Sequence, residues 1–249
     1  MTGSLVVVGT GPGKAELMTP ATAAALARAT DLVGYGPYLE RVPERSGQCR
    51  HASDNRVELD RARHALSLAA AGRQVVVVSG GDPGVFAMAA AVFEAIETGA
   101  PEWCQLDIRV EPGVTAMLAA AAEVGAPLGG DFCAISLSDN LKTWRTVERR
   151  LKAAAEGDFV LALYNPASKA RPTQLGKAFD VLRTLKSADT PVLFVRAAGT
   201  ADAQVVTTTL ASADPSRADM RTLVIVGAST TRQVGRWIYT PRSEGGGRS

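Results

Sequence analysis

The sequence has few histidine, cysteine and aromatic residues. Its 249 residues include two histidines and three cysteines, and aromatic side chains make up 5% of the chain. The cysteines, Cys49, Cys104 and Cys133, are far apart, form no CxxC pair and have almost no histidine beside them, which argues against a metal site. With no signal peptide, this pattern indicates reduced thiols in a cytoplasmic protein, used mostly for packing.

The sequence also lacks a charge imbalance and a long apolar run. It has 27 Lys and Arg against 25 Asp and Glu, for a formal net charge of +2. This balance excludes a global field that would gather nucleic acid or an anionic membrane, so local Arg and Lys must hold any anionic ligand. No apolar run reaches the roughly 20 residues that cross a bilayer, so we expect a soluble protein.

Apolar segments of strand length alternate with Ala-rich segments of helical periodicity. This rhythm, with 46% hydrophobic residues, 24 Gly and 13 Pro, predicts an α/β protein. Helices are expected from Thr19-Pro20 to about Ala29, over residues 59–71, from about Val85 and from Thr115. The predicted strands are residues 5–8, 31–34, 74–79, 108–111, 132–136, 159–164, 192–195 and 223–226.

The chain length allows two domains, and Pro112-Gly113 lies near its midpoint. We therefore expect an N-terminal α/β domain over residues 1–113 and a C-terminal α/β domain over residues 114–242. Residues 243–249 are rich in Gly and Ser without periodicity, which is typical of a disordered tail.

The first predicted strand ends in Gly9-Thr10-Gly11-Pro12-Gly13, which invites a dinucleotide-binding interpretation. The fingerprint G-x-G-x-x-G fails because position 14 is Lys, and Pro12 removes one N–H that would face a pyrophosphate. The acidic residue expected at the end of the second strand is also missing, since Asp31 lies at its start. A tight turn that requires small residues explains the loop equally well.

Three more loops follow buried strands. Ser79-Gly80-Gly81-Asp82-Pro83 joins a glycine pair to an acidic residue, which could cap the next helix or accept hydrogen bonds from ribose hydroxyls. On this loop alone, capping is the favoured interpretation. The other two loops are residues 164–169 and 227–230. Because ligands of open α/β sheets gather at the carboxyl ends of strands, four such loops suit a cleft between two domains.

Taken together, these loops resemble the pattern of the tetrapyrrole methylase family over nearly the whole chain. The resemblance rests on the order of G-x-G-P-G, G-G-D-P, P-G-V-T-A and a last strand that ends in Gly-Ala. Within the family, four segments resemble the members that methylate C17 of precorrin-3B: residues 34–38, 136–139, 162–169 and 227–230.

The resemblance implies a two-domain tetrapyrrole methylase fold with S-adenosylmethionine in the interdomain cleft, and a homodimer. It also implies that the product S-adenosylhomocysteine occupies the same site. The cofactor-binding residues carried over from the family are Pro12, Gly80, Gly81, Asp82, Val85, Thr115, Ala116, Tyr164, Asn165, Ala198, Gly199, Gly227 and Ala228.

The implied reaction is methylation of C17 of precorrin-3B with ring contraction to precorrin-4 in cobalamin biosynthesis. Ring contraction requires proton movement, for which Asp139 is the candidate acid or base. Its alternative role, which we weight more heavily, is to cap the following helix near Leu141. The candidate residues that bind the carboxylate-rich macrocycle are Tyr35, Tyr38, Arg56, Arg61, Ser138 and Lys169. Several of them have equally plausible structural roles, and a position on a solvated helix face would explain Arg61 equally well.

Three alternatives remain open on the sequence alone. A cobalt-factor III or cobalt-precorrin-3 C17-methyltransferase of the anaerobic pathway would share the motifs, and a requirement for cobalt in the macrocycle would identify it. An NAD(P)-dependent oxidoreductase rests on the first glycine loop alone. A non-catalytic tetrapyrrole carrier would bind the macrocycle without binding S-adenosylhomocysteine. For an enzyme, neighbouring pathway enzymes are candidate partners for hand-over of the substrate.

Overall fold

The computed structural model describes residues 3–54 and 57–243. Contacts divide the chain into two compact units, Met1–Ala116 and Met117–Ser249, called unit 1 and unit 2 below. The predicted substrate residue Arg56 and residues 244–249 of the predicted tail lie outside the described residues. Within the described residues, no helix has the length and apolar character needed to cross a membrane.

Unit 1 contains a five-stranded parallel sheet in the order β3-β2-β4-β1-β5. Its central strands are nearly continuous runs of Val and Leu and are buried on both faces, as parallel strands covered by helices require. The strands are β1 (Ser4–Gly9), β2 (Asp31–Tyr35), β3 (Cys49–Ser53), β4 (Gln74–Ser79) and β5 (Asp107–Glu111).

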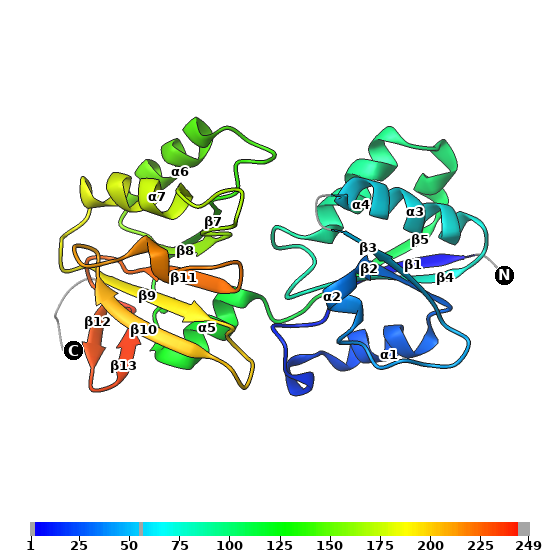
Figure 1. The fold of residues 1–249 in the computed structure, drawn as a ribbon, viewed down its shortest axis with the longest axis horizontal. Helices are drawn as coiled ribbons and strands as arrows, with labels where there is room; N and C mark the ends of the chain where they lie inside the picture. The colour runs from blue at the N-terminus through cyan, green and yellow to red at the C-terminus, as the bar shows by residue number, and fades with distance from the viewer. Residues whose placement is uncertain (1–2, 55–56, 244–249) are drawn as a thin grey trace. The chain divides into compact units, whose positions relative to one another are not determined.

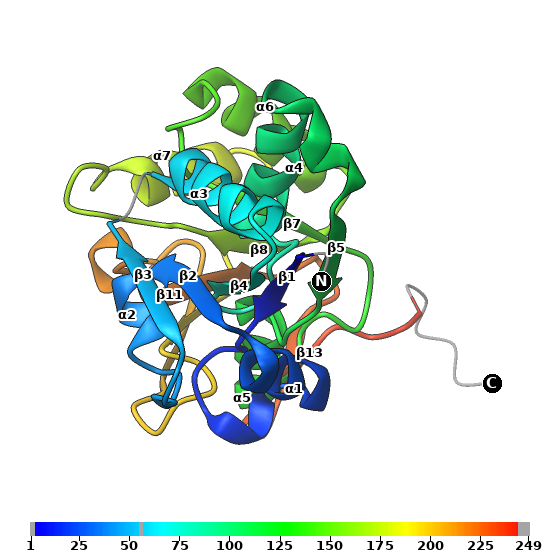
Figure 2. The ribbon, with the colours of Figure 1, turned by 90° about the vertical axis from the view of Figure 1, so that its right-hand side faces the viewer.

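The helices of unit 1 cover opposite faces of this sheet (Figures 1 and 2). Helix α1 (Pro20–Arg28) packs on Val6, Val8, Val76 and Val78, while α3 (Glu58–Ala70) and α4 (Met88–Thr98) pack on the alternate residues. Neighbouring strands β1 and β4 are therefore followed by helices on opposite faces. In open α/β sheets, ligands bind at the carboxyl ends of two strands that are followed by helices on opposite faces. The short elements are α2 (Gly36–Leu39), η1 (Ala15–Leu17) and η2 (Pro101–Gln105).

Unit 2 is built on a mixed sheet in the order β10-β9-β11-β8-β7. Its core surrounds the buried Phe179 and includes Leu151, Leu163 and Val224. Helices α6 (Trp144–Glu156) and α7 (Gln174–Arg183) lie together on one face of the sheet (Figure 1). The strands are β7 (Phe132–Ser136), β8 (Val160–Tyr164), β9 (Pro191–Arg196), β10 (Gln204–Thr209) and β11 (Thr222–Val226).

Strand direction decides which loops of unit 2 meet. Strand β7 pairs in parallel with β8, and both β8 and β9 pair antiparallel with β11. The carboxyl ends of β7, β8 and β9 therefore share one edge with the amino end of β11, where Arg196 pairs with Thr222. The remaining elements are α5 (Ala116–Val124), η3 (Pro215–Arg217) and a small sheet of β6 (Gly125–Ala126), β12 (Arg232–Val234) and β13 (Trp237–Tyr239).

All eight predicted strands are present, with ends that differ by at most two residues. The predicted start of α1 is confirmed, because the Thr19 hydroxyl accepts a hydrogen bond from Thr22 N and Pro20 is the first helical residue. The helix predicted from about Val85 is present as α4, but it begins three residues later at Met88, because Phe86 has a positive φ of 53°. The βαβ pattern did not predict α2, β3, β6, β10, β12 or β13.

Candidate functional site

Three glycine-containing loops of unit 1 are joined through their backbones at the carboxyl ends of β1, β4 and β5. Gly11 N donates to Gly81 O at 3.1 Å, and Gly81 N donates to Gly11 O at 2.9 Å. Thr10 N donates to Ser79 O at 2.9 Å, which extends the pairing back to the strand ends. The first loop and the Gly-Gly-Asp-Pro loop thus form one structural element at the carboxyl ends of β1 and β4.

This junction leaves no room for side chains on two of its glycines. A Cβ atom on Gly9 would lie 2.5 Å from Gly81 O, and one on Gly113 would lie 2.2 Å from the same oxygen. Gly81 itself has a φ of +65°, in the left-handed region that favours glycine, and Thr115 Cα lies next to it. Glycine is therefore required here by backbone packing as well as by conformation.

Asp82 holds two of these loops together. Its Oδ1 accepts from Gly84 N at 2.7 Å, and its Oδ2 accepts from Gly113 N at 3.0 Å. The favoured expectation that Asp82 caps a helix is wrong, because α4 begins six residues later at Met88. Asp82 instead closes a turn within its own loop and ties that loop to the segment that leads into α5.

The other predicted cofactor residues of unit 1 lie on the same loops. Pro12 and Val85 are half-buried, Thr115 is buried and Ala116 begins α5. Tyr38 lies against the glycine pair, because a Cβ atom on Gly80 would be 2.8 Å from its ring. Tyr35 makes an edge-to-face contact with Tyr38 at 5.4 Å. The structure therefore brings seven predicted cofactor residues and two predicted substrate residues to one edge of this sheet.

The same geometry argues against dinucleotide binding. The amides of Gly11 and Gly81 donate to each other's carbonyls, so they are not available to a pyrophosphate. Asp31 lies at the opposite, amino end of β2, where its carboxylate accepts from Arg73 Nε at 2.7 Å and contacts His51 Nε2 at 3.0 Å. The dinucleotide fold requires an acidic residue at the end of β2 to bind the ribose, and β2 ends in Gly34-Tyr35 instead.

In unit 2, the ends of β7 and β8 are joined by side-chain hydrogen bonds. Asn165 Nδ2 donates to Ser136 Oγ at 2.9 Å, and Ser138 N donates to the same oxygen at 3.3 Å. The Tyr164 hydroxyl accepts from Met117 N at 3.1 Å, in the first turn of α5. Asn165 has a positive φ of 52°, which Asn tolerates better than most residues.

The loop after β9 lies at this edge, whereas the loop after β11 does not. Ala198 and Gly199 are buried, and Gly199 N donates to Glu123 Oε1 at 3.1 Å. The expectation that Gly227 and Ala228 join these residues is wrong for this sheet, because β11 runs antiparallel to β8 and β9. Gly227 N donates to Pro191 O at the amino end of β9, so the loop lies at the opposite edge.

Asp139 is held by a glutamine at the start of α7. Gln174 Nε2 lies 3.3 and 3.2 Å from its two carboxylate oxygens, and the side chain is half-buried. The expectation that Asp139 caps the following helix is wrong, because α6 begins at Trp144 after Thr143. The carboxylate therefore lies beyond the end of β7 with a single described side-chain donor.

The predicted substrate cations differ in their surroundings. Arg61 is 5% exposed, which corrects the alternative that it lies on a solvated helix face. Its nitrogens donate to Ser53 Oγ at 2.8 Å, Asp54 O at 2.6 Å and the sulfur of Met88 at 3.2 Å. Burial lowers its pKa, against the opposing effect of nearby Glu58. Lys169 is exposed.

Sequence reasoning missed residues at both ends of the unit 2 edge. Thr222 opens β11 opposite Arg196, and only the antiparallel pairing places it there. Arg171 is buried although it belongs to a polar loop, because Ser168 and Arg171 exchange backbone hydrogen bonds of 3.1 and 3.0 Å. The spacing of residues along the sequence gives no sign of either placement. The expectation that the cysteines serve mostly for packing is correct for Cys133, which packs against the unit 2 core, and wrong for the exposed Cys49 and Cys104.

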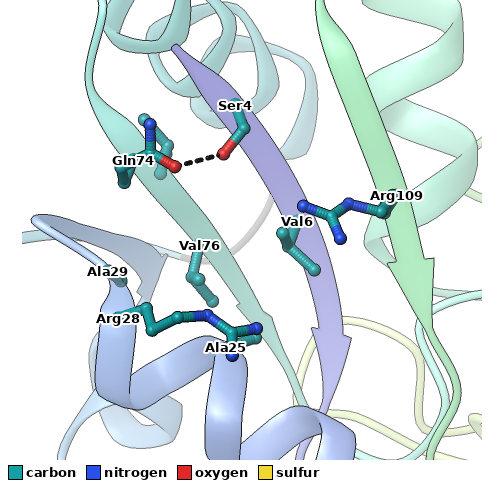
Figure 3. A pocket seen from close by; sticks show the side chains of 9 residues that line it. Ser4, Val6, Ala25, Arg28, Ala29, Gln74, Val76 and Arg109 are labelled. Atoms are coloured by element: carbon teal, nitrogen blue, oxygen red, sulfur yellow. Dashed lines mark hydrogen bonds between the residues drawn. The ribbon is translucent and has the colours of Figure 1, made fainter. Parts of the chain in front are cut away.

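A small hollow of unit 1 lies away from these loops. Figure 3 shows it at the amino ends of β1 and β4, with a volume of about 40 Å³. Ser4 Oγ donates to Gln74 Oε1 across it at 2.7 Å, and Arg28 and Arg109 contribute to its lining. Since ligands of parallel sheets bind at the carboxyl ends, this hollow is not the candidate site.

Comparison with known proteins identifies the kind of fold that carries these loops. The family model described as Tetrapyrrole (Corrin/Porphyrin) Methylases matches residues 4–214. The chain is 60% identical to a precorrin-3B C(17)-methyltransferase of Sinorhizobium sp over an alignment of 247 residues, and this alignment covers 97% of each protein. It is 41% identical to a probable cobalt-factor III C(17)-methyltransferase of Salmonella typhimurium, over 96% of this chain and 98% of that protein.

Solved structures agree with the sequence comparison. The crystal structure of the methyltransferase CobJ superposes with a TM-score of 0.94 at 56% identity, covering 96% of this chain and all of that chain. A uroporphyrin-III C-methyl transferase from Thermus thermophilus, solved in complex with S-adenyl homocysteine, superposes with a TM-score of 0.68 at 21% identity. It covers 90% of this chain and 97% of that chain, and at this identity it supports the fold alone. The chain belongs to the tetrapyrrole methylase family.

Proposed function

We propose that this protein is an S-adenosylmethionine-dependent methyltransferase that methylates C17 of precorrin-3B and contracts the ring to give precorrin-4 in cobalamin biosynthesis. The observation that carries the proposal is the 60% identity, over 97% of both chains, to a precorrin-3B C(17)-methyltransferase. The identity to the cobalt-factor III relative is 41%, which favours the metal-free substrate.

The residues of the β1/β4 edge fit S-adenosylmethionine. This cofactor contains a nucleoside and an amino acid but no phosphate, so it does not need the amides that Gly11 and Gly81 use for each other. Each Asp82 oxygen accepts one backbone N–H and retains lone-pair capacity for ribose hydroxyls. Pro12, Gly80, Gly81, Val85, Thr115 and Ala116 would complete the contacts of unit 1.

Unit 2 would supply the remaining cofactor contacts from Tyr164, Asn165, Ala198 and Gly199. These residues belong to loops that follow β8 and β9 at one edge of their sheet. Both units together would then hold one cofactor, whereas Gly227 and Ala228 are left out by their position at the other edge. A chain that ends at residue 116 and binds S-adenosylhomocysteine as tightly as the full chain would contradict this arrangement.

The bound cofactor supplies a methyl group activated by its sulfonium, so the chain does not need a covalent nucleophile. The task of the protein residues is to orient the reacting carbon of the macrocycle, an effect worth up to about 7–11 kcal/mol. Tyr35, Tyr38 and Ser138 lie on loops at the carboxyl ends of their strands and are candidates to line the macrocycle. Asp139 is the candidate to accept or donate the proton that ring contraction moves.

Three further expectations are part of this proposal. A homodimer and hand-over of the macrocycle from neighbouring pathway enzymes follow from the family resemblance, and a cytoplasmic location fits a soluble biosynthetic enzyme of this family.

Turnover with matched substrates tests the proposed function. The full chain is incubated with S-adenosylmethionine and either precorrin-3B or its cobalt-containing counterpart, and the product is followed by mass and absorption. We expect turnover of the metal-free macrocycle. Turnover of the cobalt form alone would identify the protein as an enzyme of the anaerobic pathway. Binding of the macrocycle without binding of S-adenosylhomocysteine would indicate a carrier.

A further inference from the structure

The segment from Ser168 to Gln174 contains an unusual concentration of buried polar atoms without hydrogen-bond partners. Among the described residues, five buried side-chain atoms lack a partner, and four of them belong to this segment. They are Ser168 Oγ, Arg171 Nε, Arg171 Nη1 and Gln174 Oε1. Since buried polar groups in native proteins are almost always paired, a local group of this kind requires an explanation.

Arg171 is the member with the greatest cost of burial. It is 9% exposed, and its guanidinium carries a positive charge that burial removes from water. In unit 2, Arg183 pairs with Asp180 at 3.3 Å and Arg196 with Asp219 at 2.8 Å, whereas no described carboxylate lies within 4.0 Å of Arg171. A buried charge without a partner is strongly unfavourable, so an anion that binds there would be favoured.

The electrostatic surroundings point in the same direction. Burial lowers the pKa of Lys142, and the nearby positive charges of Arg150 and Arg171 lower it further, while Asp139 opposes them. Three cations therefore act on this region against one carboxylate, and that carboxylate is already bound to Gln174 Nε2. This local excess of cationic side chains contrasts with a net charge of only +2 for the whole chain.

The fold places this segment at the edge of the unit 2 sheet where ligands of α/β proteins gather. It follows Tyr164-Asn165 at the carboxyl end of β8, and Gln174 begins α7. Gln174 also joins the segment to Asp139, beyond the end of the neighbouring strand β7. The group therefore lies on the loops of β7 and β8 and includes the candidate proton-transfer residue.

We infer that Arg171, Ser168 and Lys142 form a subsite for one carboxylate of the macrocycle, an acetate or propionate side chain. This inference rests on the proposed function, because it takes the ligand to be a carboxylated tetrapyrrole. A guanidinium offers a carboxylate two parallel hydrogen bonds, and the Ser168 hydroxyl and the Lys142 ammonium add further donors. Binding there fixes the rotation of the macrocycle relative to Asp139. Lys169, chosen from the sequence, is exposed in the same loop and is the weaker candidate.

Equilibrium binding tests the subsite without requiring turnover. Precorrin-3B is titrated, in the presence of S-adenosylhomocysteine, into wild type, Arg171→Gln, Arg171→Lys and the control Arg149→Gln, which removes an exposed charge from α6. We expect Arg171→Gln to raise the Kd for precorrin-3B by tenfold or more, and Arg171→Lys to raise it less because the charge remains. The control and the Kd for S-adenosylhomocysteine should change less than twofold.

Further outcomes separate this inference from the proposed function. If Arg171→Gln does not fold, Lys142→Gln replaces it, and we expect a severalfold increase in the Kd for precorrin-3B. An unchanged Kd in the folded variant would overturn the subsite and leave Arg171 a structural residue, even if wild type converts precorrin-3B. Binding that depends on Arg171 in a wild type that does not convert precorrin-3B would overturn the proposed reaction and retain the subsite. A wild type that binds no precorrin-3B would overturn both.

Discussion

At the scale of single residues, the structure changes the roles of the two acidic residues that the sequence singled out. Both follow a buried strand and precede a helix, so a capping role was a reasonable prediction for each. The helices begin later, at Met88 and Trp144, and the carboxylates bind other groups instead. Loop length between a strand and its helix was the missing information, because the same residue types can either cap a helix or close a turn before it.

Asp82→Asn tests whether the carboxylate serves the loops and the cofactor together. The asparagine keeps one side-chain oxygen as an acceptor, so its NH₂ group must face the N–H of either Gly84 or Gly113. The loss of one charged hydrogen bond costs about 1.5–3 kcal/mol. We expect a lower Tm and weaker binding of S-adenosylhomocysteine by calorimetry. Asp60→Asn, in an exposed pair with Arg63, is the control and should change neither. A lower Tm with unchanged affinity would assign Asp82 to loop structure alone.

Asp139→Asn tests proton transfer. The amide oxygen still accepts from Gln174, so the loop should keep its shape while the proton-accepting ability is lost. We expect a loss of about 10²-fold or more in ring contraction, the usual contribution of general acid–base catalysis, with unchanged affinity for S-adenosylhomocysteine. Single-turnover product analysis should reveal methylated, uncontracted material. Formation of precorrin-4 at the wild-type rate would leave contraction to substrate positioning.

At the scale of elements, the parallel sheet of unit 1 was predictable and the mixed sheet of unit 2 was not. Continuous apolar strands alternating with helical segments predict parallel pairing, which is correct for β1, β2 and β4. In unit 2 the same pattern hides an antiparallel edge strand, β10, whose sequence Gln-Val-Val-Thr-Thr-Thr is mostly exposed. Strand direction depends on pairing partners far apart in the chain, so the position of Gly227 and Ala228 was predicted at the wrong edge.

Gly113→Ala tests the interlocked loops. The added Cβ would lie 2.2 Å from Gly81 O and 2.8 Å from Gly9 O, and these backbone atoms are held by hydrogen bonds. We expect a destabilisation of about 1–3 kcal/mol, typical of overpacking, together with weaker binding of S-adenosylhomocysteine. Gly36→Ala is the matched control, because nothing lies within 4 Å of its Cβ position and its φ is not positive. Equal denaturation midpoints for the two variants would contradict the packing argument.

At the scale of the whole molecule, both units should lose stability in acid. Burial raises the pKa of Asp31, but hydrogen bonds from Arg73, Thr30 and His51 outweigh it and lower the pKa to about 2. In unit 2, Asp158 and Asp219 have lowered pKa values because hydrogen bonds from Ser229 and Arg196, respectively, outweigh burial. A carboxyl group with a lowered pKa in the folded state stabilises the fold above its unfolded pKa, and this contribution is lost as the pH falls.

The Asp31 contribution should therefore be complete above about pH 4 and decline toward about pH 2. The measurement is urea unfolding of wild type and Asp31→Asn between about pH 1.5 and about pH 7, a range that extends below the lowered pKa of Asp31. We expect the variant to be less stable at neutral pH and to show a smaller decrease in acid, with the two curves converging at the lowest pH. A constant difference between the curves across this range would contradict the coupling of Asp31 to its cationic partners.

In the proposed reaction, one chain both transfers a methyl group to C17 and contracts the macrocycle. The most direct measurement is a single turnover of precorrin-3B with S-adenosylmethionine whose methyl group carries ¹³C, followed by NMR and mass analysis of the product. The account predicts one labelled methyl group at C17 and the absorption of a contracted ring. A labelled methyl group at another carbon, or a ring that remains uncontracted with the wild-type protein, would contradict it.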